Sequence, residues 1–226
     1  MKTFWITTLM LGIFWTPSRK EKGMVQVKEN LLYDVGEISN IQWKEFESTL
    51  VARGENIEAY RQNEVWTDAI YRDSYFSHPA FANYPVVGIT QKGARAFCAW
   101  RNQMDQGTPG TFRLPTQAEF QYVLEKGEQS DKWQKKKARF IRRNGYVYNF
   151  WKERARMALP SESLLENELG IYHLKGNAAE LVEDGTLVVG GSWEDAPQED
   201  WKTYTNTYKG PHASVGFRCV CELDGE

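Results

Sequence analysis

The sequence lacks an apolar run long enough to cross a bilayer as a helix, which takes about 20 residues. Its longest such run covers residues 4–15, follows Lys2 and gives way to basic, polar sequence at residues 16–22. A positive residue, a short apolar core and a polar exit are typical of a secretory signal peptide. We therefore predict a signal peptide over residues 1–18, with an uncleaved membrane anchor as the alternative, and one domain over residues 24–226.

The predicted leader implies export, to the periplasm or the cell envelope, with no integral membrane span in the mature chain. The first cysteine is Cys98, so no lipid-modified cysteine can directly follow the apolar run. The chain is otherwise ordinary for a globular domain, with 41% hydrophobic and 26% charged residues among 226. That length and composition are enough for one substantial core.

Neither sign of charge is in excess, because the formal net charge is −2, and this excludes a general attraction to nucleic acid or anionic membranes. Locally, seven of the twelve residues from Lys132 to Arg143 are basic, with aromatic residues in and near the run. Such a mixture can bind a nucleic-acid strand. Because acidic residues of segment 125–131 lie next to it, we favour a solvated helix face followed by a packed loop, and expect no nucleic-acid partner.

Histidine and cysteine are scarce, with three of each, which leaves few ligands for a transition metal. No two histidines have the spacing of ligands on one helix, so we expect ordinary surface or loop residues at His78, His173 and His212.

Three helix starts are well marked. Ser39 with Gln42, and Thr116 with Glu119, form capping-box patterns, in which the side chains three residues apart can each accept from the other's backbone amide. Thr90 precedes a third segment, whose apolar residues recur at spacings of three and four. The sequence therefore predicts a helix after each of these positions.

The last third of the chain favours short strands and turns. Residues 186–189 are rich in β-branched side chains and stop at Gly190 and Gly191, and residues 215–220 form another candidate strand. The two glycines would permit a positive φ or a close backbone approach that a side chain would block.

Four blocks, in this order, resemble the formylglycine-generating enzyme family, also called the sulfatase-modifying factor family. Together they cover roughly residues 31–221, and the third is close to the family's signature around an Arg-Leu-Pro-Thr start. The blocks are residues 32–46, residues 84–100, residues 113–122, and a fourth spread over residues 170–180, 190–193 and 215–219.

The resemblance implies an α+β fold, a variant of the C-type lectin fold with few helices, a small antiparallel sheet and many ordered loops. Most of the matching residues have a structural interpretation. We expect Arg113 and Glu119 to tie a helix start to nearby loops through charged hydrogen bonds.

The resemblance also implies a disulfide between Cys98 and Cys219, which would close a loop of about 120 residues and contribute roughly 4 kcal/mol. Cys221 is left over. Since Cys219 and Cys221 would point to the same side of a strand, Cys221 is the alternative partner for Cys98.

Active members of the family carry two further cysteines that bind copper and activate oxygen to oxidise a substrate cysteine. Here the interval from Trp193 to Val215 contains no cysteine. A carboxylate cannot replace the thiolates that Cu(I) requires, so the resemblance does not extend to the oxidase chemistry. Asp195, Glu199 and Asp200 could form a general acid–base set, but acidic loops are usually only solvated, and we assign no catalytic residue.

The family also binds calcium through a segment that matches residues 173–180, where His173 stands in place of the usual Asn or Asp. No other cofactor is expected. The residues that match calcium ligands here are Gly176, Asn177, Ala178 and Glu180.

These observations favour a non-catalytic, exported binding or scaffold module with a protein partner in the cell envelope, since some family members serve in envelope secretion and motility complexes. The alternatives are a formylglycine-generating oxidase acting on sulfatase cysteines and a calcium-dependent carbohydrate-binding protein. The last rests on fold analogy alone.

Overall fold

A computed structural model describes residues 20–21, 23–64, 72–105, 107–150, 157–201 and 203–224. The predicted signal peptide lies outside these ranges. Among the described residues, no helix is both long enough and apolar enough to cross a membrane.

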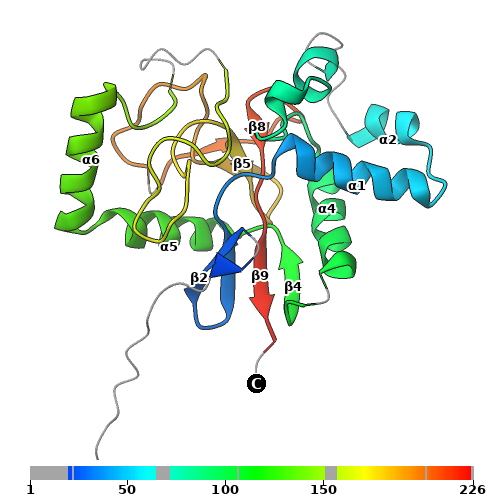
Figure 1. The fold of residues 1–226 in the computed structure, drawn as a ribbon, viewed down its shortest axis with the longest axis horizontal. Coiled ribbons are helices and arrows are strands. Elements are labelled where there is room, and N and C mark those ends of the chain that lie inside the picture. The colour runs from blue at the N-terminus through cyan, green and yellow to red at the C-terminus, as the bar shows by residue number, and fades with distance from the viewer. Residues whose placement is uncertain are drawn as a thin grey trace, which may run out of the picture.

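The first sheet joins the two ends of the domain. Its strands are β1 (Lys20–Glu21), β2 (Met24–Lys28), β3 (Leu31–Asp34), β4 (Gly110–Arg113) and β9 (Val220–Leu223), in the order β1-β2-β3-β9-β4. All pairs are antiparallel, and Leu32 of β3 and Phe112 of β4 both lie opposite Cys221. The C-terminal strand is therefore held between an early strand and a middle one (Figure 1).

The second sheet is smaller and has the order β7-β6-β5-β8. Its strands are β5 (Ala179–Leu181), β6 (Leu187–Val189), β7 (Thr205–Thr207) and β8 (Val215–Gly216). The expected α+β fold is confirmed. In the described residues the strands form two small sheets, and every pair is antiparallel except that β5 pairs with β8 in parallel. The expected strand over residues 215–220 is split between the sheets, since β8 ends at Gly216 and β9 begins at Val220.

The described helices are α1 (Asn40–Ala52), α2 (Ile57–Glu64), α4 (Gln91–Met104), α5 (Gln117–Glu128) and α6 (Asp131–Asn144), with short turns η1 (Arg72–Phe76) and η2 (Pro79–Phe81). The three predicted helix starts are confirmed. The Ser39 amide donates to Gln42 Oε1 at 2.8 Å, the Thr116 amide donates to Glu119 Oε2 at 2.8 Å, and Thr90 Oγ1 accepts from a backbone amide.

The charged contact expected at the start of α5 is also present. Arg113 donates to both oxygens of Glu119, at 2.8 and 2.7 Å. This bidentate pair joins the end of β4 to the first turn of α5 and so sets the direction in which the helix leaves the sheet.

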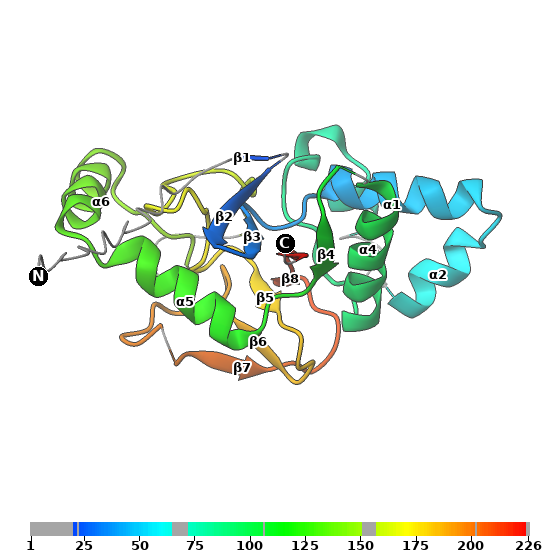
Figure 2. The same ribbon diagram turned by 90° about the horizontal axis from the view of Figure 1, so that it is seen from below.

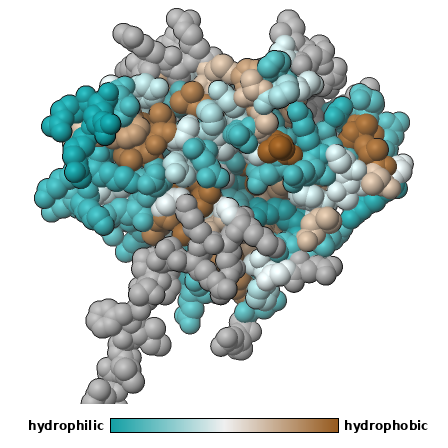
Figure 3. All heavy atoms as spheres, in the orientation of Figure 1, coloured by the Kyte–Doolittle hydropathy of each residue, from teal (hydrophilic) through white to brown (hydrophobic). Residues whose placement is uncertain are grey.

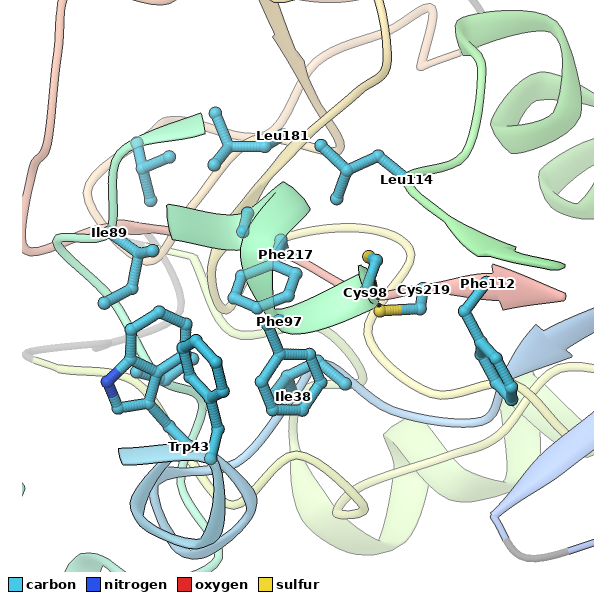
Figure 4. Packing of buried hydrophobic residues seen from close by; sticks show 14 of the residues in the cluster. Ile38, Trp43, Ile89, Phe97, Cys98, Phe112, Leu114, Leu181, Phe217 and Cys219 are labelled. Atoms are coloured by element: carbon cyan, nitrogen blue, oxygen red, sulfur yellow. Dashed lines mark hydrogen bonds between the residues drawn. The ribbon is translucent and has the colours of Figure 1, made fainter. Parts of the chain in front are cut away.

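Helices flank the sheets on two sides. In Figures 1 and 2, α1, α2 and α4 lie together at one end of the molecule, and α5 and α6 lie at the other. Under α1 and α4, Trp43 stacks on Phe97 with ring centroids 5.9 Å apart, and Phe217 meets Phe97 edge-on at 5.5 Å (Figure 4). Burying each such ring stabilises the fold by about 2 kcal/mol.

Candidate functional site

A cleft of about 500 Å³ lies over the second sheet. It is bordered by residues from all four strands of this sheet and from the segments before and after β7. The residues around it are Ala179, Val188, Ser192, Glu194, Asp195, Asn206, Thr207, Tyr208, Lys209, Gly210, Pro211, His212, Ser214 and Val215.

One wall of the cleft is fixed by Asp195. Its Oδ2 accepts from the backbone amide of Ser192 at 2.7 Å and from the Ser192 hydroxyl at 2.8 Å, while its Oδ1 accepts from the Tyr204 hydroxyl at 3.3 Å. This turn follows directly on Gly190 and Gly191, which have φ of +82° and +65°. A Cβ on Gly191 would lie 2.9 Å from the Trp201 ring, so both roles expected of these glycines are confirmed.

The border of the cleft also carries an imidazole. His212 Nδ1 lies 2.8 Å from the Ser214 hydroxyl and 3.5 Å from Glu194 Oε2. Beside it, the Tyr208 hydroxyl donates to the Ile89 carbonyl at 3.2 Å, and burial raises the pKa of Tyr208 to about 12. The cleft therefore offers carboxylate, hydroxyl, amide and imidazole groups that are already oriented by neighbours, an arrangement suited to binding a polar ligand.

The candidate acid–base set is not brought together. Asp195 borders the cleft, whereas Glu199 and Asp200 border a different hollow of about 340 Å³ between α5, α6 and Trp201.

The three cysteines lie elsewhere. Cys98 on α4 and Cys219 point toward each other in the core, with their Sγ atoms 3.0 Å apart (Figure 4). Cys221 is fully buried on β9, where a Cβ on Gly110 would lie 2.8 Å from its sulfur. The thiol that faces Cys98 is thus that of Cys219, and the disulfide between them stays a prediction.

Burial also suppresses thiol reactivity. It raises the pKa of Cys98 well above the ordinary value and the pKa of Cys221 to about 11. Thiols with such pKa values stay protonated near neutral pH, and a protonated thiol is a poor nucleophile and a poor metal ligand.

The residues that match the family's calcium ligands are bound to protein groups instead. Glu180 is fully buried, and its two oxygens accept from Arg218 Nε at 2.7 Å and from Arg218 Nη2 at 2.5 Å. Among the residues that the structure describes, no cluster of three acidic, histidine or cysteine side chains is arranged to hold a metal ion. A calcium ion at Glu180 would have to displace a guanidinium, so these contacts do not favour it, and calcium binding stays a prediction.

Asn177 joins this buried network from a positive φ of +64°. Its Oδ1 accepts from the Asn149 side chain at 3.0 Å and from the Leu159 amide at 2.7 Å, and its Nδ2 donates to Glu37 Oε1 at 2.9 Å. The neighbouring Gly176, also at a positive φ, approaches the backbone of Asn149 so closely that a Cβ would lie 2.6 Å from its carbonyl oxygen. The segment is therefore fixed by hydrogen bonds within the protein.

The two charged residues at the centre of this network, Glu37 and Arg218, had no role assigned from the sequence. Burial raises the pKa of Glu37 to about 8. The signal that could have identified Arg218 is its place in a strongly apolar stretch between Phe217 and Cys219, because an arginine there needs a buried carboxylate partner.

The histidines differ in setting. His78 is exposed and its Nδ1 accepts from the Ala80 amide at the start of η2. His173 is a loop residue, but it is buried, and burial lowers its pKa to about 3. It is therefore neutral at physiological pH.

Comparison with known proteins adds to this picture. The family model for the sulfatase-modifying factor enzyme 1-like domain matches residues 22–223. No curated protein matches the chain.

Among solved structures, CarF is 20% identical, with 86% of this chain and 87% of that chain covered and a TM-score of 0.55. PvdO from Pseudomonas aeruginosa is 15% identical, with coverage of 85% and 80% and a TM-score of 0.56. Treponema denticola variable protein 1 is 16% identical, with coverage of 85% and 84% and a TM-score of 0.56. At these identities the likeness shows a common fold.

Proposed function

Because this chain belongs to the family of sulfatase-modifying factor enzyme 1-like domains, we propose that it uses the family's fold as a non-catalytic binding or scaffold module of the cell envelope. In this proposal the cleft over the second sheet binds a polar segment of a protein partner, in the setting of an envelope secretion or motility complex. Formylglycine-generating oxidation is the alternative that the proposal rejects.

The observation that carries the proposal is the separation of the cleft from the sulfur atoms. The sequence between Trp193 and Val215 contributes much of the cleft and contains no cysteine. All three thiols are buried in the core instead. Monovalent copper selects soft sulfur ligands, whereas the groups around the cleft are hard oxygen donors and one imidazole.

The electrostatics of the cleft support binding rather than acid–base chemistry. Asp195 accepts three hydrogen bonds, and none of the three donors is a basic side chain. Burial, and then the charge of Asp195, raises the pKa of Tyr204. A phenol that stays neutral and is held beside a carboxylate in this way orients a ligand, and its raised pKa makes it a poor partner for proton exchange near neutral pH.

The first test is an oxidase assay. The purified chain, loaded with copper under oxygen, is incubated with a sulfatase peptide that contains the target cysteine, next to a family oxidase that has both catalytic cysteines. We expect the peptide mass to stay unchanged with this chain and to shift with the oxidase. Conversion by this chain would overturn the proposal.

The second test addresses binding. Full-length protein that carries a cross-linker at the cleft is used to capture partner proteins from intact envelopes. The cleft variant Glu194→Gln/Asn206→Ala is compared with the matched surface variant Glu45→Gln/Gln134→Ala. We expect one envelope protein to be lost with the cleft variant and retained with the surface variant. Equal capture by both would remove the cleft as the binding site.

A further inference from the structure

Helix α6 carries a large excess of positive charge. Between Asp131 and Asn144 there are seven basic residues and one acid, a net charge of +6. Because the whole chain has a formal charge of −2, the remainder carries −8. The small net charge therefore hides a strong segregation of charge, which matters for any anionic surface that approaches α6.

The ends of α6 are firmly set. Ser130 Oγ accepts from the Trp133 amide at 3.1 Å, and Gly145 ends the helix at φ +87°, with its amide donating to the Ile141 carbonyl at 2.7 Å. These are a standard N-cap and a left-handed glycine C-cap. The charges of α6 are thus presented on a defined helix.

The inner side of α6 packs on the protein. Trp133 is 1% exposed, and Lys136 pairs with Glu166 at 2.7 Å. Lys137 lies over the rings of Trp133 and Tyr148, with its Nζ 5.0 and 4.7 Å from their centroids. These two lysines are therefore engaged within the fold.

The outer side carries four cations, Lys132, Lys135, Arg139 and Arg142, which we name the basic stripe. They are exposed and follow one another at spacings of three, four and three residues, so they lie along one face of the helix over about 15 Å. In Figures 1 and 2, α6 lies at the edge of the molecule, and the same region is strongly hydrophilic in Figure 3.

No carboxylate in the described part of the chain pairs with the basic stripe. Among the described residues, none of the four side chains forms an ion pair, and their single contact is a hydrogen bond from Arg139 Nε to the Lys135 carbonyl at 3.3 Å. Like charges at these spacings repel one another and destabilise a helix. An anionic partner would relieve this repulsion.

We propose that the basic stripe is a docking surface for an anionic lipid bilayer. A straight row of flexible cations on a peripheral helix fits a flat, negatively charged surface, and the −8 charge on the remainder would turn the rest of the molecule away from it. The exported location expected from the leader would place the chain beside such a surface. This inference goes beyond the proposed function and does not depend on it, since no residue of the stripe borders the cleft.

Single-stranded nucleic acid fits the surface less well. Proteins that bind it combine cations with exposed aromatic rings on which bases stack. On α6, Trp133 is buried, Phe140 is half-buried, and both lie on the side of the helix away from the stripe. The stripe itself contains no aromatic residue.

The test measures how much of the full chain sediments with lipid vesicles at several salt concentrations. Neutral vesicles contain phosphatidylcholine alone, and anionic vesicles contain phosphatidylglycerol as about one lipid in three. The stripe variant Lys132→Gln/Lys135→Gln/Arg139→Gln/Arg142→Gln is compared with the control variant Lys44→Gln/Arg53→Gln/Lys92→Gln/Arg95→Gln, whose residues lie outside both the stripe and the cleft. Both remove four positive charges, and glutamine is a good helix former, so α6 is retained. Circular dichroism checks that both variants are folded.

We expect the protein to bind anionic vesicles and the binding to weaken as salt is added. Each cation near such a surface contributes about fivefold in affinity. The affinity of the stripe variant should therefore fall by at least about 100-fold, and that of the control should change by less than about threefold. Equal binding of the two variants, or equal binding to neutral vesicles, would overturn the proposal. Tighter binding to a single-stranded oligonucleotide than to the vesicles would replace lipid with nucleic acid as the partner and so also overturn it.

Discussion

Arg218 and Glu180 form an ion pair in which both side chains are completely buried, with two hydrogen bonds of 2.7 and 2.5 Å between them. Arg218 uses its other donors on the carbonyls of Asp34 and Tyr172, at 3.2 and 3.0 Å. One side chain thereby ties β5 to the end of β3 and to the loop that contains His173. This contact joins the two sheets.

Removing one partner of this pair should be costly. We expect Arg218→Met to destabilise the protein by about 3–5 kcal/mol, because it leaves the Glu180 carboxylate buried without a counter-charge. The double variant Arg218→Met/Glu180→Leu should lose clearly less. Urea unfolding of both variants measures this, and equal losses would show that the pair does not act as a unit.

Glu37 should make stability depend on pH. Burial raises its folded pKa from 4.5 to about 8, so the stability that it contributes is present below about pH 4.5 and is lost as the pH rises toward 8. That loss is on the order of 5 kcal/mol. The isosteric variant Glu37→Gln cannot ionise and should therefore be more stable than the wild type at pH 8.

Urea unfolding between about pH 6.5 and 8 isolates this effect. His173, with a folded pKa of about 3 and an unfolded pKa of about 6.5, contributes equally to the wild type and to Glu37→Gln, so its contribution cancels in the difference between their stabilities. Parallel stability curves for the wild type and Glu37→Gln across the window would contradict the assignment.

Counting free thiols tests the predicted disulfide between Cys98 and Cys219. If Cys98 and Cys219 are joined in the exported protein, denatured unreduced material should contain one free thiol, Cys221→Ser none, and Cys98→Ser two. Reduction should cost about 4 kcal/mol of stability, since the two cysteines are 121 positions apart. Two free thiols in Cys221→Ser beside one in the wild type would show that Cys221 takes part in the bond, and three in the wild type would show that no disulfide forms.

Gly191 should tolerate no side chain. It has φ +65°, and an added Cβ would lie 2.9 Å from the Trp201 ring, so we expect Gly191→Ala to destabilise the protein by about 1–3 kcal/mol. Gly170 has φ +81° with nothing within 4 Å of an added Cβ, which makes Gly170→Ala the control for backbone strain without a clash. Thermal unfolding of both compares them, and an equal or larger loss at Gly170 would argue against the role of the ring.

Much of the local structure could be predicted because its partners are close in sequence. The capping pairs span three residues, and Arg113 and Glu119 are six residues apart, so each contact forms once a single turn has formed. The split of residues 215–220 could not be predicted in this way. Whether those residues continue one strand or divide between two depends on β5 on one side and β3 and β4 on the other.

The amino-acid sequence by itself determined that no sulfur ligand lies between Trp193 and Val215, that the chain contains the family's four blocks, and that helices follow Ser39, Thr90 and Thr116. The tertiary structure alone decided which buried charges meet, because Asn177 and Glu37 are 140 positions apart, and Arg218 and Glu180 are 38 apart. It also decided that α6 turns its cations outward. Pairing over such distances depends on the packing of the whole core, and no local pattern encodes it.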